Sequence, residues 1–437
     1  MKSLSYKIFK LNYYNLLILF LCLFFSISIY AQTNSFVKST EVRNISFQKV
    51  SNDSLKEKKN KSKDTLSSKD VHPQDAPETS GLVIESKDKN LSMRFYGSVR
   101  VFGSYDFNGL QGGTGFALGE IPVKEEDLNE ETFYMTANVT RLGIEVKRKT
   151  FVGNTLIRVE TDFNGPDNKF RIRQAYGQTS HFIVGQTWTN FSDIETLPLT
   201  VDVDGPPTAV TSRPVLIKYY LDFDPGWRFR ASIESPSSEI YIPDSLSVEE
   251  VSQNYPAVAA NIKKDWKAFQ IKFAAILNPI SVRNLSGDRA ALIGQGAFLS
   301  MNGDLSTGSS LKFQGLLGKG IASYLNLGNN AAYDVILDPN DGEYQLTACY
   351  GGFVAYNQVV IDRYLDIDVV YGLVKLNMED YFPDDSFKAG EYIALNAFFT
   401  PPELFRLGIE YTYGLKKDKN GKSGNANRFA FTFYFTF

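Results

Sequence analysis

The sequence predicts an all-β fold, a transmembrane antiparallel β-barrel of about 16 strands with a disordered N-terminal periplasmic segment before it. Apolar and polar residues alternate with a period of two through most of residues 91–437, as in strands with one apolar and one wet face. The predicted connections are long at one end of the strands and short at the other. Aromatic residues make up 14% of the chain and cluster on the apolar faces, as they do at the membrane interfaces of barrels.

Residues 1–31 have the pattern of a secretory signal peptide. Lys2, Lys7 and Lys10 precede an apolar run over 11–30, and Ala31 is the small residue at the expected cleavage site. An uncleaved anchor helix is the alternative, because the run is long. We expect cleavage after Ala31 and export from the cytoplasm.

Residues 32–90 differ in composition from everything that follows them. The stretch KEKKNKSKDTLSSKD (56–70) is charged, rich in Ser and nearly free of apolar side chains. Such a stretch cannot bury enough surface to offset the entropy lost on ordering. We therefore expect a flexible polar periplasmic linker over 32–90.

Residues 91–437 are expected to form the barrel, and their alternation gives sixteen candidate strands. The first carries Met93 and Phe95 on one face and Arg94 on the other. The candidates are 93–107, 133–147, 153–163, 168–179, 182–190, 213–223, 227–235, 256–264, 267–277, 291–302, 309–318, 343–356, 360–373, 388–399, 402–414 and 427–437. An even number of strands is typical of single-chain bacterial barrels.

The connections between these strands favour a barrel over a soluble β-sandwich. The odd-numbered connections are long, apart from 164–167, and the even-numbered ones are mostly tight turns. The long ones are 108–132, 191–212, 236–255, 278–290, 319–342, 374–387 and 415–426. Outer-membrane barrels sort their loops in this way, and a sandwich has no reason to do so.

Charge and composition exclude several classes of function. Lys and Arg number 46 against 49 Asp and Glu, so the net charge of −3 does not suit a nucleic-acid binder. Only Cys22 and Cys349 occur, so no disulfide framework is available. With His72 and His181 as its only histidines, the chain cannot build a histidine-rich metal site, and we expect no cofactor.

The wet face of the predicted strands would line a lumen, because a barrel of sixteen strands is wide enough to hold water. Cationic residues recur on that face at similar depth. They are Arg100, Arg141, Arg158, Arg171, Arg173, Lys218, Arg230 and Arg406. Such a wall favours anions in a pore. The alternative is that these residues only form pairs with Glu160, Asp162, Glu234 and Glu410.

The connection over 191–212 is a candidate constriction loop. It is the third connection at its end of the barrel when the short connection 164–167 is counted as the second. It carries Asp193, Glu195, Asp202 and Asp204, and three prolines that would stiffen it. If it folds inward, its carboxylates are expected to face the cationic wall across a narrow eyelet. The alternative is an external loop.

Five stretches resemble one known family, the DcaP-like trimeric outer-membrane porins. They are TRLGIEVK (140–147), FRIRQAYGQ (170–178), IVGQTWTNF (183–191), GKGIASYL (318–325) and LGIEYTYG (407–414). The resemblance implies a trimeric sixteen-stranded porin in the bacterial outer membrane, with an inward third loop and an Arg-lined pore for small anions such as dicarboxylates. Arg141, Arg171 and Arg173 lie in the matching stretches, whereas Arg100, Arg158 and Arg230 rest on periodicity alone.

The resemblance favours passive diffusion of small anionic solutes, with outer-membrane lipid and two further copies of the chain as partners. A surface-binding or adhesion barrel without a transport role is the main alternative. A hydrolase is a weaker one, because His181 lies in a predicted turn and His72 in the linker, and neither has a nucleophile motif beside it. We therefore expect no enzymatic activity.

Overall fold

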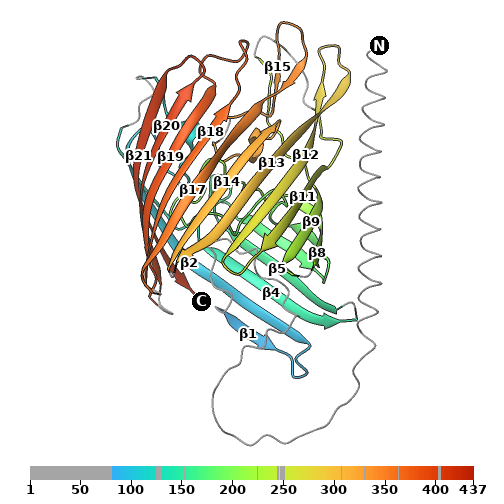
Figure 1. Ribbon diagram of the computed structural model, residues 1–437, viewed down its shortest axis with the longest axis vertical. Coiled ribbons are helices and arrows are strands. Elements are labelled where there is room, and N and C mark those ends of the chain that lie inside the picture. The colour runs from blue at the N-terminus through green and yellow to red at the C-terminus, as the bar shows by residue number, and fades with distance from the viewer. Residues whose placement is uncertain are drawn as a thin grey trace, which may run out of the picture. The chain divides into compact units, whose positions relative to one another are not determined.

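The computed structural model describes residues 81–437 apart from 125–129, 152, 224, 244–245, 247–250, 307, 329–330, 363 and 402–404. The expected signal peptide and nearly all of the expected linker lie outside the described residues. The rest of the chain forms a closed antiparallel barrel of sixteen strands, as predicted (Figure 1). Among the described residues, no helix is long and apolar enough to cross a membrane.

Within the residues that the structure describes, the barrel sheet has eighteen strand segments. They are β1 (Leu82–Glu85), β2 (Leu91–Asn108), β3 (Thr132–Thr136), β4 (Arg141–Thr150), β5 (Gly153–Asp162), β6 (Arg171–Gln178), β7 (Phe182–Gln186), β8 (Val215–Phe223), β9 (Trp227–Glu234), β11 (Ala257–Asp265), β12 (Phe269–Arg283), β13 (Arg289–Ser306), β14 (Ser309–Lys319), β17 (Ala348–Ile361), β18 (Leu365–Leu376), β19 (Phe387–Phe399), β20 (Arg406–Asp418) and β21 (Ser423–Thr436). These segments make sixteen strands around the wall, because β3 and β4 are halves of one strand and β1 only extends the ladder on β2 beyond β21. The barrel closes where β2 pairs with β21.

Smaller elements lie in the loops of the described part of the chain. They are the sheet strands β10 (Ile240–Tyr241), β15 (Val335–Leu337) and β16 (Tyr344–Leu346), and the 3-10 turns η1 (Leu118–Glu120), η3 (Pro166–Asn168) and η4 (Ala322–Tyr324). β10 pairs with β15 in parallel, so a small sheet joins the connection between β9 and β11 to the connection between β14 and β17. Alternation over two or three residues is too short to predict these strands from the sequence.

The second barrel strand differs from its prediction as a single strand over 133–147. It is broken into β3 and β4, and both halves pair with β2. At the break, the backbone N–H of Arg100 donates a hydrogen bond to Thr140 Oγ1 at 3.1 Å. This side chain provides an acceptor where the ladder is interrupted, so the wall stays closed.

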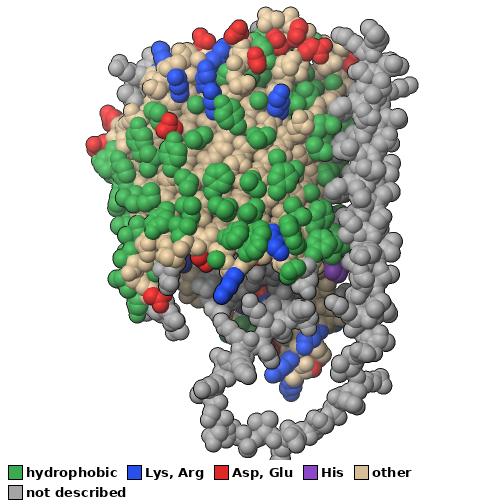
Figure 2. All heavy atoms as spheres, in the orientation of Figure 1, with side chains coloured by type: hydrophobic (Ala, Val, Ile, Leu, Met, Phe, Trp, Pro, Cys, Tyr) green, Lys and Arg blue, Asp and Glu red, His purple; other side chains and the backbone are tan. Residues whose placement is uncertain are grey.

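The outer face of the barrel is apolar. Phe313, Val354, Tyr371 and Ile393 are neighbours across four adjacent strands, and each is 37–41% exposed. Figure 2 shows such side chains as a broad band around the visible wall, with charged groups at both ends. In lipid the backbone must satisfy its own hydrogen bonds, which a closed sheet does.

The connections are sorted by length as predicted, with two corrections. The connections expected at 278–290 and 415–426 are tight turns over 284–288 and 419–422. Gly287 and Gly421 have φ values of 84° and 86° in these turns, a conformation that glycine adopts without steric cost. The strands on either side are correspondingly longer than their alternation predicted.

Loops fill the interior at the end where the long connections lie. One buried apolar cluster joins three of these connections. It contains Phe116 and Leu118 from the connection between β2 and β3, Phe191 from that between β7 and β8, and Ile321 from that between β14 and β17. Gly414 of β20 makes room for this filling, because a Cβ there would come within 2.5 Å of Phe116 Cε1. This filling narrows the lumen, and a further cavity of about 490 Å³ remains at this end between the first connection and the end of β20.

The linker boundary expected at residue 90 is wrong for its last residues. Residues 82–85 form β1, which pairs with β2 from Leu82 opposite Phe95 to Glu85 opposite Ser92. β21 pairs with β2 only as far as Ser98. β1 therefore continues the ladder beyond the end of β21, at the same end of the barrel as the C-terminus (Figure 1).

Two deletions should separate the linker from β1. Removing 33–80 is expected to leave a folded barrel, because that stretch is polar. Removing 33–86 uncovers the edge of β2 and should lower the free energy of unfolding by about 1–2 kcal/mol, the scale of a few ladder hydrogen bonds. Urea unfolding of the purified proteins measures the difference, and equal stability of the two deletions would contradict a structural role for β1.

Candidate pore and constriction loop

The third connection, residues 187–214, crosses the inside of the barrel. It starts at β7 and returns to β8, yet its partners are on distant strands. Asn261 Nδ2 of β11 donates to the carbonyl of Asn190 at 2.8 Å, Lys312 Nζ of β14 donates to that of Leu197 at 2.6 Å, and Gln314 Nε2 donates to that of Thr208 at 2.6 Å. The loop is thus held along the inner wall by side chains that reach for its carbonyl groups.

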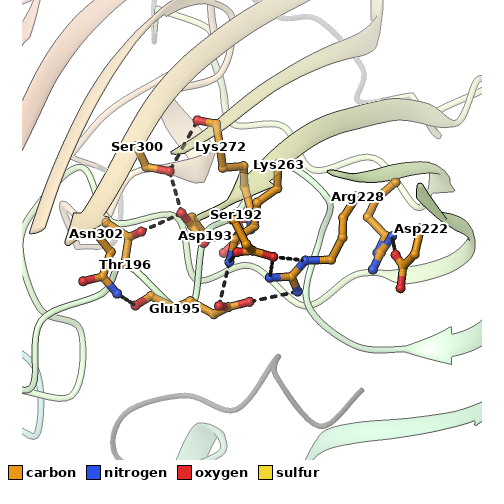
Figure 3. A network of polar contacts seen from close by, with 12 residues as sticks. Ser192, Asp193, Glu195, Thr196, Asp222, Arg228, Lys263, Lys272, Ser300 and Asn302 are labelled. Atoms are coloured by element: carbon orange, nitrogen blue, oxygen red, sulfur yellow. Dashed lines mark hydrogen bonds and ion pairs between the residues drawn. The ribbon is translucent and has the colours of Figure 1, made fainter. Parts of the chain in front are cut away.

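The first part of this loop is held by ion pairs (Figure 3). Asp193 Oδ1 lies 2.8 Å from Lys272 Nζ, and Asp193 Oδ2 accepts hydrogen bonds from Ser300 Oγ at 2.5 Å and Thr196 Oγ1 at 2.6 Å. Burial alone would raise the pKa of Asp193, but the charge of Lys272 and its neighbour Lys263 outweighs it and lowers that pKa to about 2. Asp193 is therefore a charged anchor.

The tip of the loop is held by hydrogen bonds to the carboxylates of Glu410 and Asp202. Glu410 of β20 accepts hydrogen bonds from the backbone N–H groups of Val201 at 2.8 Å and Asp202 at 3.1 Å. Asp202 accepts from Tyr392 Oη at 3.0 Å and from the N–H of Phe116 at 3.0 Å. Burial, and then the negative charges of Asp204 and Glu410, raise the pKa of Asp202 well above its ordinary value.

The two anchors should respond to pH in opposite ways. Asp202 favours its protonated form in the folded loop, so its contribution is full below its ordinary pKa near 4 and is lost as the pH rises through the raised value. Asp193 contributes above the ordinary pKa and loses its contribution only as the pH falls toward about 2. We expect the tip to loosen, and single-channel conductance to rise, as the pH rises above the ordinary carboxyl pKa near 4.

The variant Asp202→Asn isolates this effect, because an amide keeps hydrogen-bonding atoms at the site and cannot ionise in this range. Its conductance should be nearly independent of pH once the salt concentration is fixed. A slope equal to that of the unmodified protein would assign the pH dependence to other groups of the lumen.

Four of the predicted arginines meet around a narrow cleft beside the loop. Arg100, Arg141, Arg171 and Arg173 line it together with Val203. The guanidinium groups of Arg173 and Arg171 form ion pairs with carboxylates of β5. Arg173 pairs with Glu160 at 3.0 Å and with Asp162 at 3.1 Å, and Arg171 pairs with Asp162 at 2.7 Å. This part of the wall is therefore partly neutralised by its own carboxylates.

A cavity of about 260 Å³ lies on the other side of the loop, toward the short turns. Short turns face the periplasm in outer-membrane barrels, so this is the periplasmic side. Its described cationic lining residues are Arg94, Lys147, Arg158, Lys218, Arg228, Arg230, Lys263 and Lys272. The described carboxylates of the lining are Glu145 and Glu195. Eight positive charges against two negative charges make this the most cationic space described.

The structure brings three more predicted residues into this cavity. Arg158 pairs with Glu145 at 2.6 Å, Lys218 Nζ donates to the carbonyl of Trp188 at 2.9 Å, and Arg230 pairs with Asp222 at 2.8 Å. Arg406 lies apart from both spaces as the described residues outline them. Its Nε donates to Thr400 Oγ1 at 3.2 Å.

The expectation that the loop carboxylates face the arginine wall needs correction. Asp193 and Glu195 are paired with cations of β9, β11 and β12, and Asp202 is turned toward Tyr392. The side chain of Asp204 is exposed, and that of Glu195 is partly exposed to the cavity. The reason is that buried lysines and backbone N–H groups at the wall need acceptors, and these carboxylates provide them.

Sequence reasoning missed several cations of the cavity, Arg94, Arg228, Lys263 and Lys272 among them. Arg94 and Arg228 were on the polar face of their strands, and Lys263 and Lys272 occupy the same kind of position in β11 and β12. These four residues lie near the short turns, whereas the prediction was based on cations at mid-depth in the strands. Treating every inward cation on the periplasmic half as a candidate would have found them.

A closed sixteen-stranded barrel with an apolar belt and a loop across a charged lumen defines an outer-membrane channel of the porin class. Comparison with protein families agrees. The chain belongs to the DcaP outer membrane protein family, which matches residues 32–437. The protein is therefore a bacterial outer-membrane channel.

Solved structures show the same fold. The outer membrane channel DcaP of Acinetobacter baumannii is 20% identical with a TM-score of 0.70, over 81% of this chain and 99% of that one. An anion-selective porin from Comamonas acidovorans is 11% identical with a TM-score of 0.54, over 79% and 100% of the two chains. OmpF of Salmonella typhi, in complex with daunomycin, is 12% identical with a TM-score of 0.51, over 81% and 100%. A sequence search of curated proteins gives no match.

Proposed function

We propose that this channel lets small solutes diffuse passively and prefers anions, with dicarboxylates as the solute class. The observation that carries the proposal is the periplasmic cavity, whose lining has eight cations and two carboxylates. Cationic rings favour anions in pores, and a guanidinium group can bind a carboxylate through two parallel hydrogen bonds. A cavity of about 260 Å³ suits a small solute.

Two further observations support the proposal. Arg158 and Arg94 share the single carboxylate Glu145, at 2.6 and 3.2 Å, so that group of charges is positive as a whole. A porin with the same fold is described as anion-selective. We further propose that the seven predicted cations that line the cleft or the cavity, all of the eight except Arg406, act with the other cavity cations as the anion path, and that the channel is a homotrimer.

The test is the reversal potential of the purified protein in planar bilayers under a KCl gradient. We expect the sign that reports chloride as the more permeant ion, and concentration-dependent block of the chloride current by succinate. A cation-selective reversal potential would overturn the proposal. Absence of conductance would instead favour the surface-binding alternative.

A further inference from the structure

Glu195 of the third loop extends its carboxylate into the cationic cavity. We propose that Glu195 is a built-in competitor that occupies the binding site of a solute carboxylate and is displaced during passage. The site itself consists of Lys263 and Arg228. This inference rests on the proposed function, because it assigns a regulating group to the anion path.

The contacts of Glu195 are those that a bound carboxylate would make. Its Oε2 lies 2.6 Å from Lys263 Nζ, and its Oε1 lies 3.4 Å from Arg228 Nη1. All three side chains line the cavity. Figure 3 shows Glu195 reaching from the loop toward the two cations, which project from the wall. The side chains of Lys263 and Arg228 are only 3% and 12% exposed, so their charges are weakly screened by water.

The side chain of Glu195 is not the group that fixes the loop. Its backbone carbonyl accepts a hydrogen bond from Asn302 Nδ2 at 3.1 Å, and the next fixed carbonyl, of Leu197, accepts from Lys312. Asp193, two residues earlier, is 1% exposed and enclosed by Lys272, Ser300 and Thr196. Glu195 is 18% exposed and faces the cavity. It can therefore leave its partners while the loop stays in place.

A channel needs such a competitor because a pore must bind its solute weakly enough to release it. Lys263 and Arg228 also share Asp265 of β11, with Arg228 Nη2 at 2.5 Å and Lys263 Nζ at 3.5 Å. Asp265 supplies one negative charge against these two positive charges, so the three side chains together carry a net charge of +1. Glu195 balances it when the cavity is empty, and the exchange of one carboxylate for another keeps the cations paired as a solute enters and leaves.

The experiment compares block of the chloride current by succinate in four proteins. Glu195→Gln should lower the half-blocking concentration by about five- to tenfold, the effect of removing one partly exposed competing ion pair. Glu195→Asp keeps the charge but shortens the side chain, and should lower it by a smaller factor. Asp222→Asn removes the same charge from the partner of Arg230, and should leave it within about twofold.

The outcomes separate the roles. Equal effects of Glu195→Gln and Asp222→Asn would show that Glu195 acts only through its general field, and would overturn the proposal. An unchanged or raised half-blocking concentration in Glu195→Gln would do the same. Flux of a neutral sugar reports the loop position: it should be unchanged in Glu195→Gln, and an increase would reveal an anchor and overturn the proposal. Cation selectivity of the unmodified protein is a separate result that rejects the proposed function itself.

Discussion

Replacing Asp106 by Ala will destabilise the barrel by about 3–5 kcal/mol, the cost of leaving a buried charge without its partner. Asp106 of β2 and Arg428 of β21 form a two-pronged pair, with Nε to Oδ1 at 2.6 Å and Nη2 to Oδ2 at 3.0 Å. Both are almost fully buried, at 0% and 2% exposure. The pair joins the first and last strands of the barrel, so its loss acts where the sheet closes.

The same arginine also holds the first loop, because its Nη1 donates to the carbonyls of Gly113 at 3.1 Å and Gly115 at 2.7 Å. We expect Asp106→Ala to move the urea midpoint of unfolding strongly to lower concentration. Lys169→Ala is the control, since it breaks an exposed ion pair of 3.0 Å with Asp167, whose own φ of 55° would strain an alanine. Exposed pairs contribute little. Similar midpoints for the two variants would show that the buried pair is not stabilising.

The double replacement of Arg158 by Gln and Lys218 by Met will reduce the ratio of anion to cation permeability by roughly three- to tenfold. Both residues line the periplasmic cavity, and the change lowers its lining charge from six to four positive charges. Reversal potentials measure the ratio. Arg173 is the poorer choice, because its removal would leave Glu160 and Asp162 buried without it and confound selectivity with stability.

The control for this change removes two positive charges elsewhere. Lys417 and Lys422 are exposed at the opposite end of the barrel, in the hairpin of β20 and β21. Replacing both by Gln should shift the reversal potential far less, because exposed charges are screened beyond about 10 Å. An equal shift would mean that the total charge, and not the cavity, determines selectivity.

Period-two alternation was enough to predict the barrel, its sixteen strands and which residues of each strand point inward. It could not assign partners. Whether Asp193 faces the arginine wall or Lys272 depends on how a loop packs against strands that are distant in the sequence. β1 was missed because the four residues of LVIE are too short to show alternation and adjoin a polar stretch. The alternation places Lys263 on the inner face of its strand, but it lies close to a turn and so outside the mid-depth positions that were expected to select anions.

The cavity and the apolar loop filling lie on opposite sides of the third loop, and this makes the channel electrically asymmetric. On the proposed anion path, anions driven from the periplasm would gather in this positively charged cavity before the narrow passage. From the other side they first meet a cavity in whose lining three carboxylates, of Glu120, Asp385 and Asp418, stand against two cations, Lys124 and Lys416. A difference in the height of the two entry barriers produces a current that depends on the sign of the applied voltage. We therefore expect weak rectification of the current, with outward and inward movement of the same solute limited by different steps.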